Sequence, residues 1–434
     1  MTERKNRSEY KGRKQDYEMT KRPRDENNTL GTKGGPLDGI RVIELGHFIA
    51  APFCARLLAD LGAEVIKVEP PSGDPVREWG LKKDGNSIWW SVHGRNKQTV
   101  TANLKSEAGR QIVIDLVKQS DVLIENFRAG HLAQLGLSDE VLREANQRLI
   151  IAHVSGFGQT GPDKDRSGFG AIGEAMGGLR YLTNHAPGTT DLPPVRVGIS
   201  IGDSIAGMYA AIGIISGLWQ RDHVGGTNQG QPVDVALTES VLSMMEGLIP
   251  EHSVLGVVRE PVGARIPTAA PTSAYRSADG KWIVIAANSQ PLFASLCTVM
   301  ERPELSEDPR FRDNQSRVNN VDALDDAIQS WTEGLDIEQI EAALVKGNIP
   351  ASRIYNAEDI ALDRQYRARG MVHEVEDPLI GRVSHPGVVP HMPESERHLC
   401  WTGRKIGADS DTILSTLLGM SKERIEELRR EGAI

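Results

Sequence analysis

Asp203 is a residue that could carry chemistry, because it stands where a strand pattern gives way to a helix pattern. Residues 195–201 alternate between apolar side chains and small or polar ones, which is typical of a strand. From Ile205 onward, apolar residues recur at intervals of three and four, which predicts a helix with Asp203 as its N-cap. The amides and dipole of a helix favour an ionised carboxylate, which can act as a nucleophile. A purely capping role for Asp203 is the alternative.

Two motifs in the chain suggest other chemistry, and both lack the context they require. Residues 198–202, GISIG, match the G-x-S-x-G nucleophile elbow, but the alternation places Ser200 inside the strand rather than at a sharp turn. Residues 156–161, GFGQTG, spell G-x-G-x-x-G, yet residues 162–168 are typical of a loop. A dinucleotide site needs a helix at that point.

The composition predicts a globular chain of two domains. It has 434 residues, 39% of them hydrophobic, and a formal net charge of -9, which argues against a nucleic-acid or membrane binder. Its three separated cysteines fit a reducing, cytoplasmic setting. Residues 1–35 are polar and are expected to form a disordered extension. We expect neither a metal nor a nucleoside triphosphate, because no ligand spacing and no Walker loop occur.

Strand and helix patterns alternate along the first half of the chain. Expected strands at 40–45, 64–68, 122–124 and 149–154 predict a doubly wound, mostly parallel, Rossmann-like α/β sheet. Ligands bind beyond the carboxyl ends of such strands, so we expect one site formed by His47, residues 126–128 and Gly202-Asp203. A large domain is expected at 36–230, a linker helix at 231–257, a smaller α+β domain at 258–370 and a returning linker at 371–394.

Several ordered segments of the chain resemble class III coenzyme A transferases, whose sister branch is the 2-methylacyl-CoA racemases. The matching segments are PLDGIRVIEL at 36–45, LGAEVIKVE at 61–69, ENFR at 125–128, GFGQTGP at 156–162 and Gly202-Asp203. The resemblance covers nearly all of 36–434. It implies an interlocked homodimer, a large domain completed by 395–434, and a catalytic aspartate at Asp203.

The resemblance favours transfer over racemisation. A racemase needs a second base, and the histidine of that branch falls near Phe169, while its further glutamate falls near Arg276. The formyl-CoA branch has a glutamine where Ile49 stands and a Tyr-Glu pair where Phe169-Gly170 stands, so formate is not the expected substrate. An acyl-CoA racemase stays as the alternative within the superfamily.

The expected reaction moves CoA from an acyl-CoA thioester to a free small carboxylic acid through anhydride and aspartyl-CoA intermediates on Asp203. Arg196 can pair with a second carboxylate, which favours a donor such as succinyl-CoA, although a structural role is equally open. His47, Ile49, Phe169 and Gly202 are the other candidate substrate contacts. The candidate CoA contacts are Arg95, Lys97, Asn126, Phe127, Arg128 and Gly156.

Two alternatives from other classes follow from the residues themselves. A CoA-thioester hydrolase would use Ser200 with His223, His252 or His373 as its base. A non-catalytic acyl-CoA binder would bind CoA without exchanging it between acids.

Overall fold

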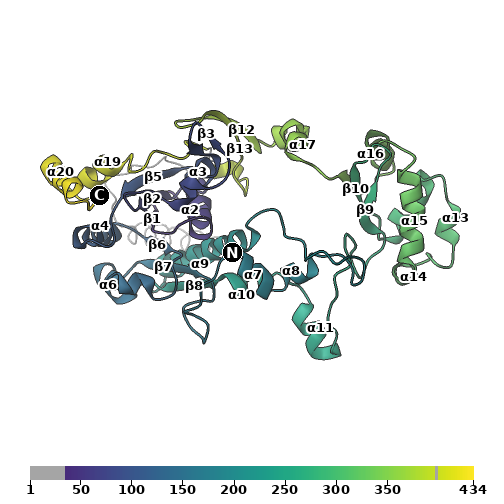
Figure 1. Cartoon of the computed structure of the whole chain (residues 1–434), viewed down its shortest axis with the longest axis horizontal. Coiled ribbons are helices and arrows are strands. Elements are labelled where there is room, and N and C mark those ends of the chain that lie inside the picture. Colours follow the sequence, from purple (N-terminus) through teal and green to yellow (C-terminus); the bar gives the residue numbers. More distant parts are fainter. Residues whose placement is uncertain (1–34, 396–398) are drawn as a thin grey trace, which may run out of the picture. The chain divides into compact units, whose positions relative to one another are not determined.

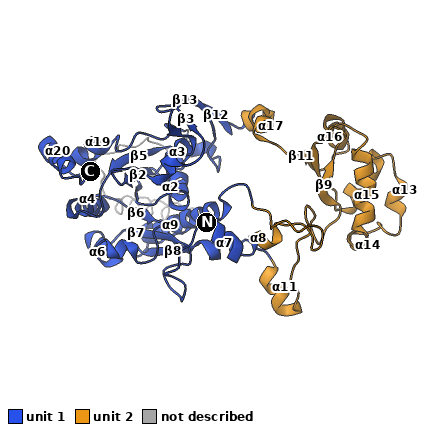
Figure 2. Ribbon diagram, in the orientation of Figure 1, with its two compact units in different colours: residues 1–179, 197–246, 368–434 blue, residues 180–196, 247–367 orange. Residues whose placement is uncertain are grey.

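The computed structural model describes residues 35–395 and 399–434 and divides the chain into two compact units (Figure 2). The first unit comprises 1–179, 197–246 and 368–434, and the second comprises 180–196 and 247–367. Residues 231–246 and 371–394, expected as parts of linkers, thus pack with the first unit. The expected extension, apart from Gly35, lies outside the described residues.

A six-stranded parallel sheet forms the centre of the first unit, in the order β5-β2-β1-β6-β7-β8 (Figure 1). Counted along the chain, this is the order 3-2-1-4-5-6 of a Rossmann-type sheet. The expected doubly wound parallel sheet is therefore confirmed. The strands are β1 (Arg41–Glu44), β2 (Glu64–Glu69), β5 (Lys97–Thr101), β6 (Val122–Glu125), β7 (Ile150–Ser155) and β8 (Pro232–Ala236).

Alternate residues of the strands pack into two separate apolar clusters, one on each face of the sheet. One cluster contains side chains from α4 (Glu107–Lys118), α6 (Asp139–Ala145), α19 (Ser410–Thr416) and α20 (Lys422–Arg430). The other contains side chains from α2 (Ala50–Asp60) and α9 (Ile201–Asp222). The two C-terminal helices thus complete the core of the first unit.

Short elements surround this sheet. They are η2 (Pro75–Glu78), β3 (Lys82–Lys83), β4 (Asn86–Ser87), α3 (Ile88–His93), α5 (His131–Gln134), α7 (Gly170–Met176), α10 (Leu237–Leu242) and η3 (Pro393–Ser395). The short helix α8 (Leu179–Leu182) begins at the boundary and belongs mostly to the second unit. The segment expected as a returning linker, 371–394, contains an antiparallel hairpin of β12 (Val372–Asp377) and β13 (Gly381–Pro386).

The second unit contains an antiparallel three-stranded sheet in the order β11-β10-β9. Its elements are α11 (Leu248–Leu255), β9 (Thr272–Arg276), β10 (Trp282–Ala286), α12 (Gln290–Val299), α13 (Glu304–Glu307), α14 (Asn314–Asn319), α15 (Val321–Thr332), α16 (Ile337–Lys346), β11 (Ala351–Arg353), α17 (Ala357–Leu362) and α18 (Arg364–Ala368), the last ending at the unit's boundary. The expected small α+β domain has this architecture.

Two expected elements differ in the structure. The strand expected at 195–201 does not form, because Val195 and Ile199 are exposed and the segment pairs with no strand of the described chain. The linker helix expected at 231–257 is instead strand β8 followed by two helices, α10 and α11. They are interrupted by Glu246, whose φ of 50° is not helical, and by Gly247.

α9 is long and apolar enough to cross a membrane by length and composition alone. Half of this apolar stretch is buried inside the protein, where α9 contacts α2, α7 and α10. We therefore assign α9 as a core helix.

Candidate active site

The carboxyl ends of β1 and β6 bring His47 and Asn126 together, as expected. The side chain of Asn126 holds the backbone of His47 on both sides: Oδ1 accepts from the His47 amide at 2.7 Å, and Nδ2 donates to its carbonyl at 2.9 Å. The rings of His47 and Phe127 meet edge to face, with centroids 5.3 Å apart. These contacts fix the loop after β1 against the loop after β6.

Buried charged side chains contact the loop that contains His47 and hold it in place. Lys67 Nζ donates to Glu44 at 2.8 Å, to Asp74 at 2.6 Å and to the carbonyl of Gly46. Asp74 accepts from the amide of Phe48 at 3.2 Å. Burial alone would raise the pKa of Asp74, but the Lys67 ammonium outweighs it and holds that pKa well below its usual range. The loop thus rests on ion pairs that persist at ordinary pH.

Asp203 lies in the first turn of α9, and Ser200 occupies the N-cap position. The expectation that Asp203 is the N-cap was wrong, because α9 begins three residues earlier than the pattern indicated. The carboxylate is half-buried and still lies within the turn where unpaired amides and the helix dipole favour an anion.

Gly170 and Gly202 allow the starts of α7 and α9 to touch at Asp203. A Cβ atom built on Gly170 would overlap the Asp203 carboxylate, lying 2.7 Å from its Cγ. A Cβ atom on Gly202 would lie 2.8 Å from the carbonyl oxygen of Gly170. Neither position has room for a side chain, so the backbone of α7 forms one wall around the Asp203 carboxylate.

α9 packs on α2 through Gly207, one helical turn beyond Asp203. A Cβ atom there would lie 2.8 Å from the carbonyl oxygen of Ala50, which is the first residue of α2 and follows His47 by three positions. The start of α9 and the loop after β1 are therefore at the same end of the sheet. The sequence placed Asp203 at this end correctly, although no strand leads into α9.

The remaining candidate substrate contacts occupy different environments. Phe169 precedes α7 and is 67% exposed beside Gly170, whereas Ile49 is buried against Val76 and Trp90. Arg196 is exposed and belongs to the second unit, so the structure does not place it with Asp203.

Two candidate CoA contacts join the loops after β6 and β7. Arg128 is exposed and donates to the hydroxyl of Ser167. A Cβ atom on Gly156 would lie 2.8 Å from the Cα of Gly168, so these loops pack backbone against backbone. The glycine-rich stretch at 156–161 thus has a close-packing role, and no helix opens directly on it.

Arg95 and Lys97 are interior residues rather than exposed cations. Arg95 forms an ion pair with Asp60 and donates to the carbonyl of Pro386 at 2.6 Å. Lys97 pairs with Glu44 at 2.7 Å, and burial, which outweighs this pair, lowers its pKa to about 8. This geometry favours a structural role and does not support either residue as a phosphate ligand.

The hydrolase alternative loses its geometric basis. No strand precedes Ser200, as the nucleophile elbow requires. His223 lies at the opposite end of the 22-residue α9, about 33 Å away by helical rise. His252 is in the second unit, and His373 lies on β12.

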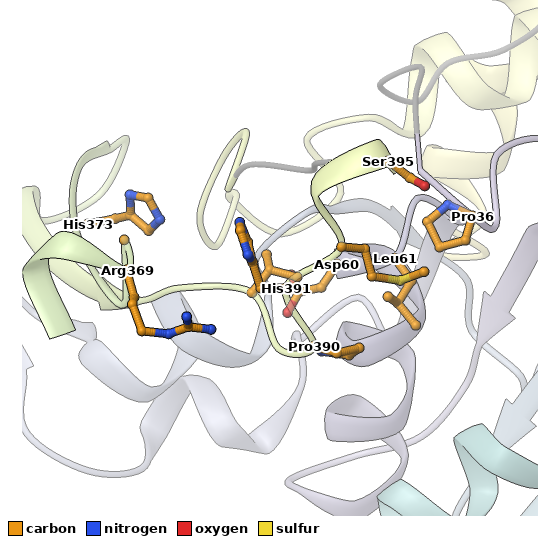
Figure 3. Close-up of a pocket in the computed structure, with 11 residues that line it drawn as sticks. Pro36, Asp60, Leu61, Arg369, His373, Pro390, His391 and Ser395 are labelled. Carbon is orange, nitrogen blue, oxygen red and sulfur yellow. The ribbon is translucent and has the colours of Figure 1, made fainter. Parts of the chain in front are cut away.

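A cavity of about 80 Å³ lies at the far end of α2 from His47 (Figure 3). Asp60 and Leu61 at the end of α2, together with Arg369, His373 and His391, are among its lining residues. None of the candidate site residues lines it, so this cavity is separate from the candidate site.

His153 is not among the residues predicted for the site, and the structure places it between Glu125 and Asp139. A usable signal was present: His153 is the one titratable residue in the otherwise uncharged strand IIAHVS at 150–155.

With this geometry established, comparison with known proteins identifies the family. Residues 37–410 match the model of CoA-transferase family III. The chain belongs to this family. It is thus a class III CoA-transferase, and the resemblance seen in the sequence is confirmed.

The relatives agree on the reaction and on the fold. Over 401 residues the chain is 44% identical to the succinyl-CoA–D-citramalate CoA-transferase of Chloroflexus aurantiacus, covering 92% of this chain and 98% of that protein. It is 37% identical to the alpha subunit of the succinyl-CoA–L-malate CoA-transferase of Chloroflexus aurantiacus, covering 92% of each. The crystal structure of a CAIB/BAIF family protein from Brucella suis aligns with a TM-score of 0.78 and 31% identity, covering 89% of this chain and all of that one.

Proposed function

We propose that this class III CoA-transferase moves CoA from succinyl-CoA to a free small dicarboxylic acid, with Asp203 as the nucleophile. The observation that carries the substrate class is the 44% identity, over nearly the whole of both chains, to a transferase that uses succinyl-CoA and D-citramalate. The position of Asp203 in the first turn of α9, against the backbone of Gly170, supports its role.

The proposed reaction begins when a carboxylate oxygen of Asp203 attacks the thioester carbonyl carbon of succinyl-CoA. The carbon–sulfur bond breaks, and CoA thiolate leaves a mixed anhydride on Asp203. The thiolate then attacks the Asp203 carbonyl carbon, which releases succinate and leaves an aspartyl-CoA thioester. The acceptor carboxylate repeats these two steps in reverse, so that one thioester replaces another and no other energy source is consumed.

The start of α9 suits the charges of this sequence. The first-turn amides of a helix are unpaired and favour an anion, and each well-placed donor to an oxyanion is worth on the order of 3 kcal/mol. The backbone around Gly202, held against the carbonyl of Gly170, is our candidate for these donors. Because Gly170 leaves no space on that side, substrate approaches Asp203 from elsewhere.

The loops after β1 and β6 are the proposed contacts for the coenzyme. His47 and Phe127 present an edge-to-face aromatic pair, and Arg128 nearby is an exposed cation suited to a phosphate. Arg196 remains our candidate partner for the second carboxylate of the acid.

The test is to look for CoA carried on the protein. Incubation with succinyl-CoA followed by peptide mass analysis is expected to find CoA linked to the peptide that contains Asp203. Asp203→Asn is expected to lose the adduct and to slow transfer of label from succinyl-CoA to citramalate or malate by at least roughly 10³-fold, as when a nucleophile is removed.

Ser200→Ala is the matched variant. The Ser200 side chain makes no capping hydrogen bond to α9, so its removal leaves the helix start intact, and transfer is expected to continue at close to the wild-type rate. Undiminished transfer by Asp203→Asn, or loss of transfer in Ser200→Ala alone, contradicts the assignment.

Acetate, a monocarboxylate, tests the class of acceptor. It is expected to accept CoA more slowly than citramalate or malate.

We also propose that two copies of the chain associate, interlocked as the family resemblance implies. The outer face of α9 supports association, because Met208, Ile212 and Trp219 expose apolar side chains along it. The free thiols of Cys54 and Cys297 are consistent with the proposed cytoplasmic setting.

A further inference from the structure

His153 is a buried histidine that takes no part in the proposed reaction. It contacts Glu125, the residue directly before Asn126 and Phe127 of the candidate site. It is on β7, where it stands opposite Glu125 of β6 in the register of the parallel sheet (Figure 1). Only 7% of His153 is exposed. An ionisable ring in such a position needs polar partners, because burying an unpaired polar group is costly.

Both ring nitrogens of His153 face carboxylates. Nδ1 lies 2.6 Å from Glu125 Oε1, and Nε2 lies 3.1 Å from an oxygen of Asp139, the first residue of α6. Ionised carboxylates only accept hydrogen bonds, so both nitrogens carry hydrogen and the ring is cationic. Burial alone would lower the pKa of His153, but the hydrogen bonds to Asp139 and Glu125 outweigh it and raise that pKa to about 10.

The other oxygen of Glu125 connects this ion pair to the site. Glu125 Oε2 accepts from the backbone amide of Phe127 at 2.6 Å. Between them, Asn126 makes its two hydrogen bonds to the backbone of His47. A continuous series of contacts therefore runs from Asp139 through His153 and Glu125 to the loop that holds His47.

The charges around His153 show why a cation is needed there. Asp234 is its register neighbour on β8 and accepts from the amide of Gln159, in the loop after β7, at 2.9 Å. On α6, Asp139 is stabilised as an anion by His153 and more weakly by Arg143. Two carboxylates, Glu125 and Asp139, thus contact the His153 ring. Without the charge of that ring, Glu125 and Asp139 would face one another without a cation between them.

We propose that His153 is a positioning residue of the acyl-CoA site, which it orders by fixing Glu125 and, through Glu125, the Asn126-Phe127 loop. The inference rests on the proposed function, since that function assigns this loop to coenzyme binding. His153 itself touches no substrate.

The test measures CoA binding by calorimetric titration with coenzyme A alone, alongside KM and kcat for succinyl-CoA. His153→Gln keeps a donor but removes the charge. We expect it to raise both the Kd for CoA and the KM for succinyl-CoA roughly tenfold, the usual size of a lost charge-assisted hydrogen bond, and to change kcat much less. Such a split between KM and kcat points to ordering of the binding loop.

A double-mutant cycle tests whether His153 affects CoA binding through Glu125. Glu125→Gln retains an oxygen for the Phe127 amide but removes the charge that His153 fixes. If His153 acts through Glu125, His153→Gln adds little to the Kd in the Glu125→Gln background. Equal losses of affinity in both backgrounds, or a wild-type Kd for His153→Gln, would overturn the inference.

Thr99→Val is the control for general destabilisation. Thr99 is buried on β5, three strands away from β6, where its hydroxyl bonds the carbonyl of Lys405. Thr99→Val is expected to lower the melting temperature without changing the Kd for CoA.

If His153→Gln does not fold, Asp139→Asn takes its place. The inference then requires a smaller rise in Kd, and an unchanged Kd overturns it.

The binding experiment also separates this inference from the proposed function. A wild-type protein that binds CoA but transfers no label would refute the proposed reaction, and the role of His153 would still be decided by the Kd values. A wild-type protein that transfers label while His153→Gln binds CoA normally would refute only the positioning role.

Discussion

At the scale of single residues, the candidate nucleophile is confined by a glycine. Gly170 leaves space for the Asp203 carboxylate only because it has no side chain, since a Cβ atom there would lie 2.7 Å from Asp203 Cγ and 3.3 Å from its backbone nitrogen. The backbone atoms of α7 and α9 cannot move apart cheaply, because Gly202 is packed on the carbonyl of Gly170. The carboxylate itself must therefore yield to any added methyl group.

Gly170→Ala is expected to lower kcat for CoA transfer roughly 100-fold, because a displacement of about 1 Å at a reacting group costs that much. The measurement is the initial rate of label transfer from succinyl-CoA, with the melting temperature as a check on folding. Gly198→Ala is the matched control, since nothing lies within 4 Å of its added Cβ. Near-normal transfer by Gly170→Ala would show that the carboxylate works in a different position.

Long-range ion pairs explain which site residues the sequence could not assign. Arg95 and Lys97 resemble exposed phosphate ligands in the sequence, but their partners, Asp60 and Glu44, are 35 and 53 positions away and become visible only in the fold. The same holds for His153, whose partner Glu125 belongs to a different strand. His47, Asn126 and Asp203 were assigned from local patterns because they directly follow strands or begin a helix.

At the scale of elements, α3 is joined to the hairpin of β12 and β13 by a buried triplet. The Ser91 hydroxyl donates to Asp377 at 2.5 Å and lies 2.9 Å from Nε2 of His385. Since serine has one hydrogen to donate, His385 donates from Nε2, and the neutral ring leaves Nδ1 without hydrogen. That buried nitrogen has no partner in the part of the chain that the structure describes.

The buried, neutral His385 of this triplet is expected to make the folded protein less stable in mild acid. Burial, helped by Arg95, lowers the pKa of His385 to about 4. Between about pH 4 and 6.5 the unfolded chain therefore binds a proton at this residue that the folded chain does not. The contribution of His385 to stability is present above pH 6.5 and is lost as the pH falls towards 4. His93, whose pKa is lowered to about 3 mainly by burial, acts in the same direction.

Melting temperatures measured from pH 7.5 to 4.5 test this expectation. The wild-type melting temperature should fall as the pH falls. In His385→Asn the fall should be shallower, because the His385 contribution is gone, but it should not vanish, because the His93 contribution remains. The exposed His185 provides the control, since His185→Asn should leave the slope unchanged. An identical slope in His385→Asn would mean that His385 titrates alike in both states.

The sequence predicted those elements whose pattern the core enforces. Four strands of the large sheet, β1, β2, β6 and β7, are buried along their whole length, so that apolar runs located them to within a few residues. The alternation at 195–201 predicted a strand that does not form, because a strand also needs a neighbouring strand to pair with. Val195 and Ile199 lie on the surface instead. The break at Glu246 depends on a single backbone angle that no periodicity reveals.

At the scale of the whole molecule, the chain divides into two compact units whose bounds differ from those of the domains predicted from the sequence. Residues 180–196 join the second unit although they precede α9 in the chain, and α19 and α20 return to the first unit from the other end. Sequence texture put the start of the small domain at residue 258, whereas the second unit resumes at Gly247. It could not show which distant segments share a core, because that depends on contacts between residues far apart in the chain.

The apolar face of α9 gives the last prediction. Ile212 is 59% exposed and Trp219 is 66% exposed on a helix whose other side is buried in the core. Leaving such a stripe in water is unfavourable at about 25 cal/mol per Å² of apolar surface, so association of two chains should cover it.

Light scattering after size exclusion is expected to give twice the chain mass of 47.4 kDa. Ile212→Glu should yield monomer or aggregate, while Gln111→Glu, an exposed change on α4, should leave the dimer intact. A wild-type protein that is monomeric and active would show that one chain holds the complete site, and an Ile212→Glu dimer would place the interface elsewhere.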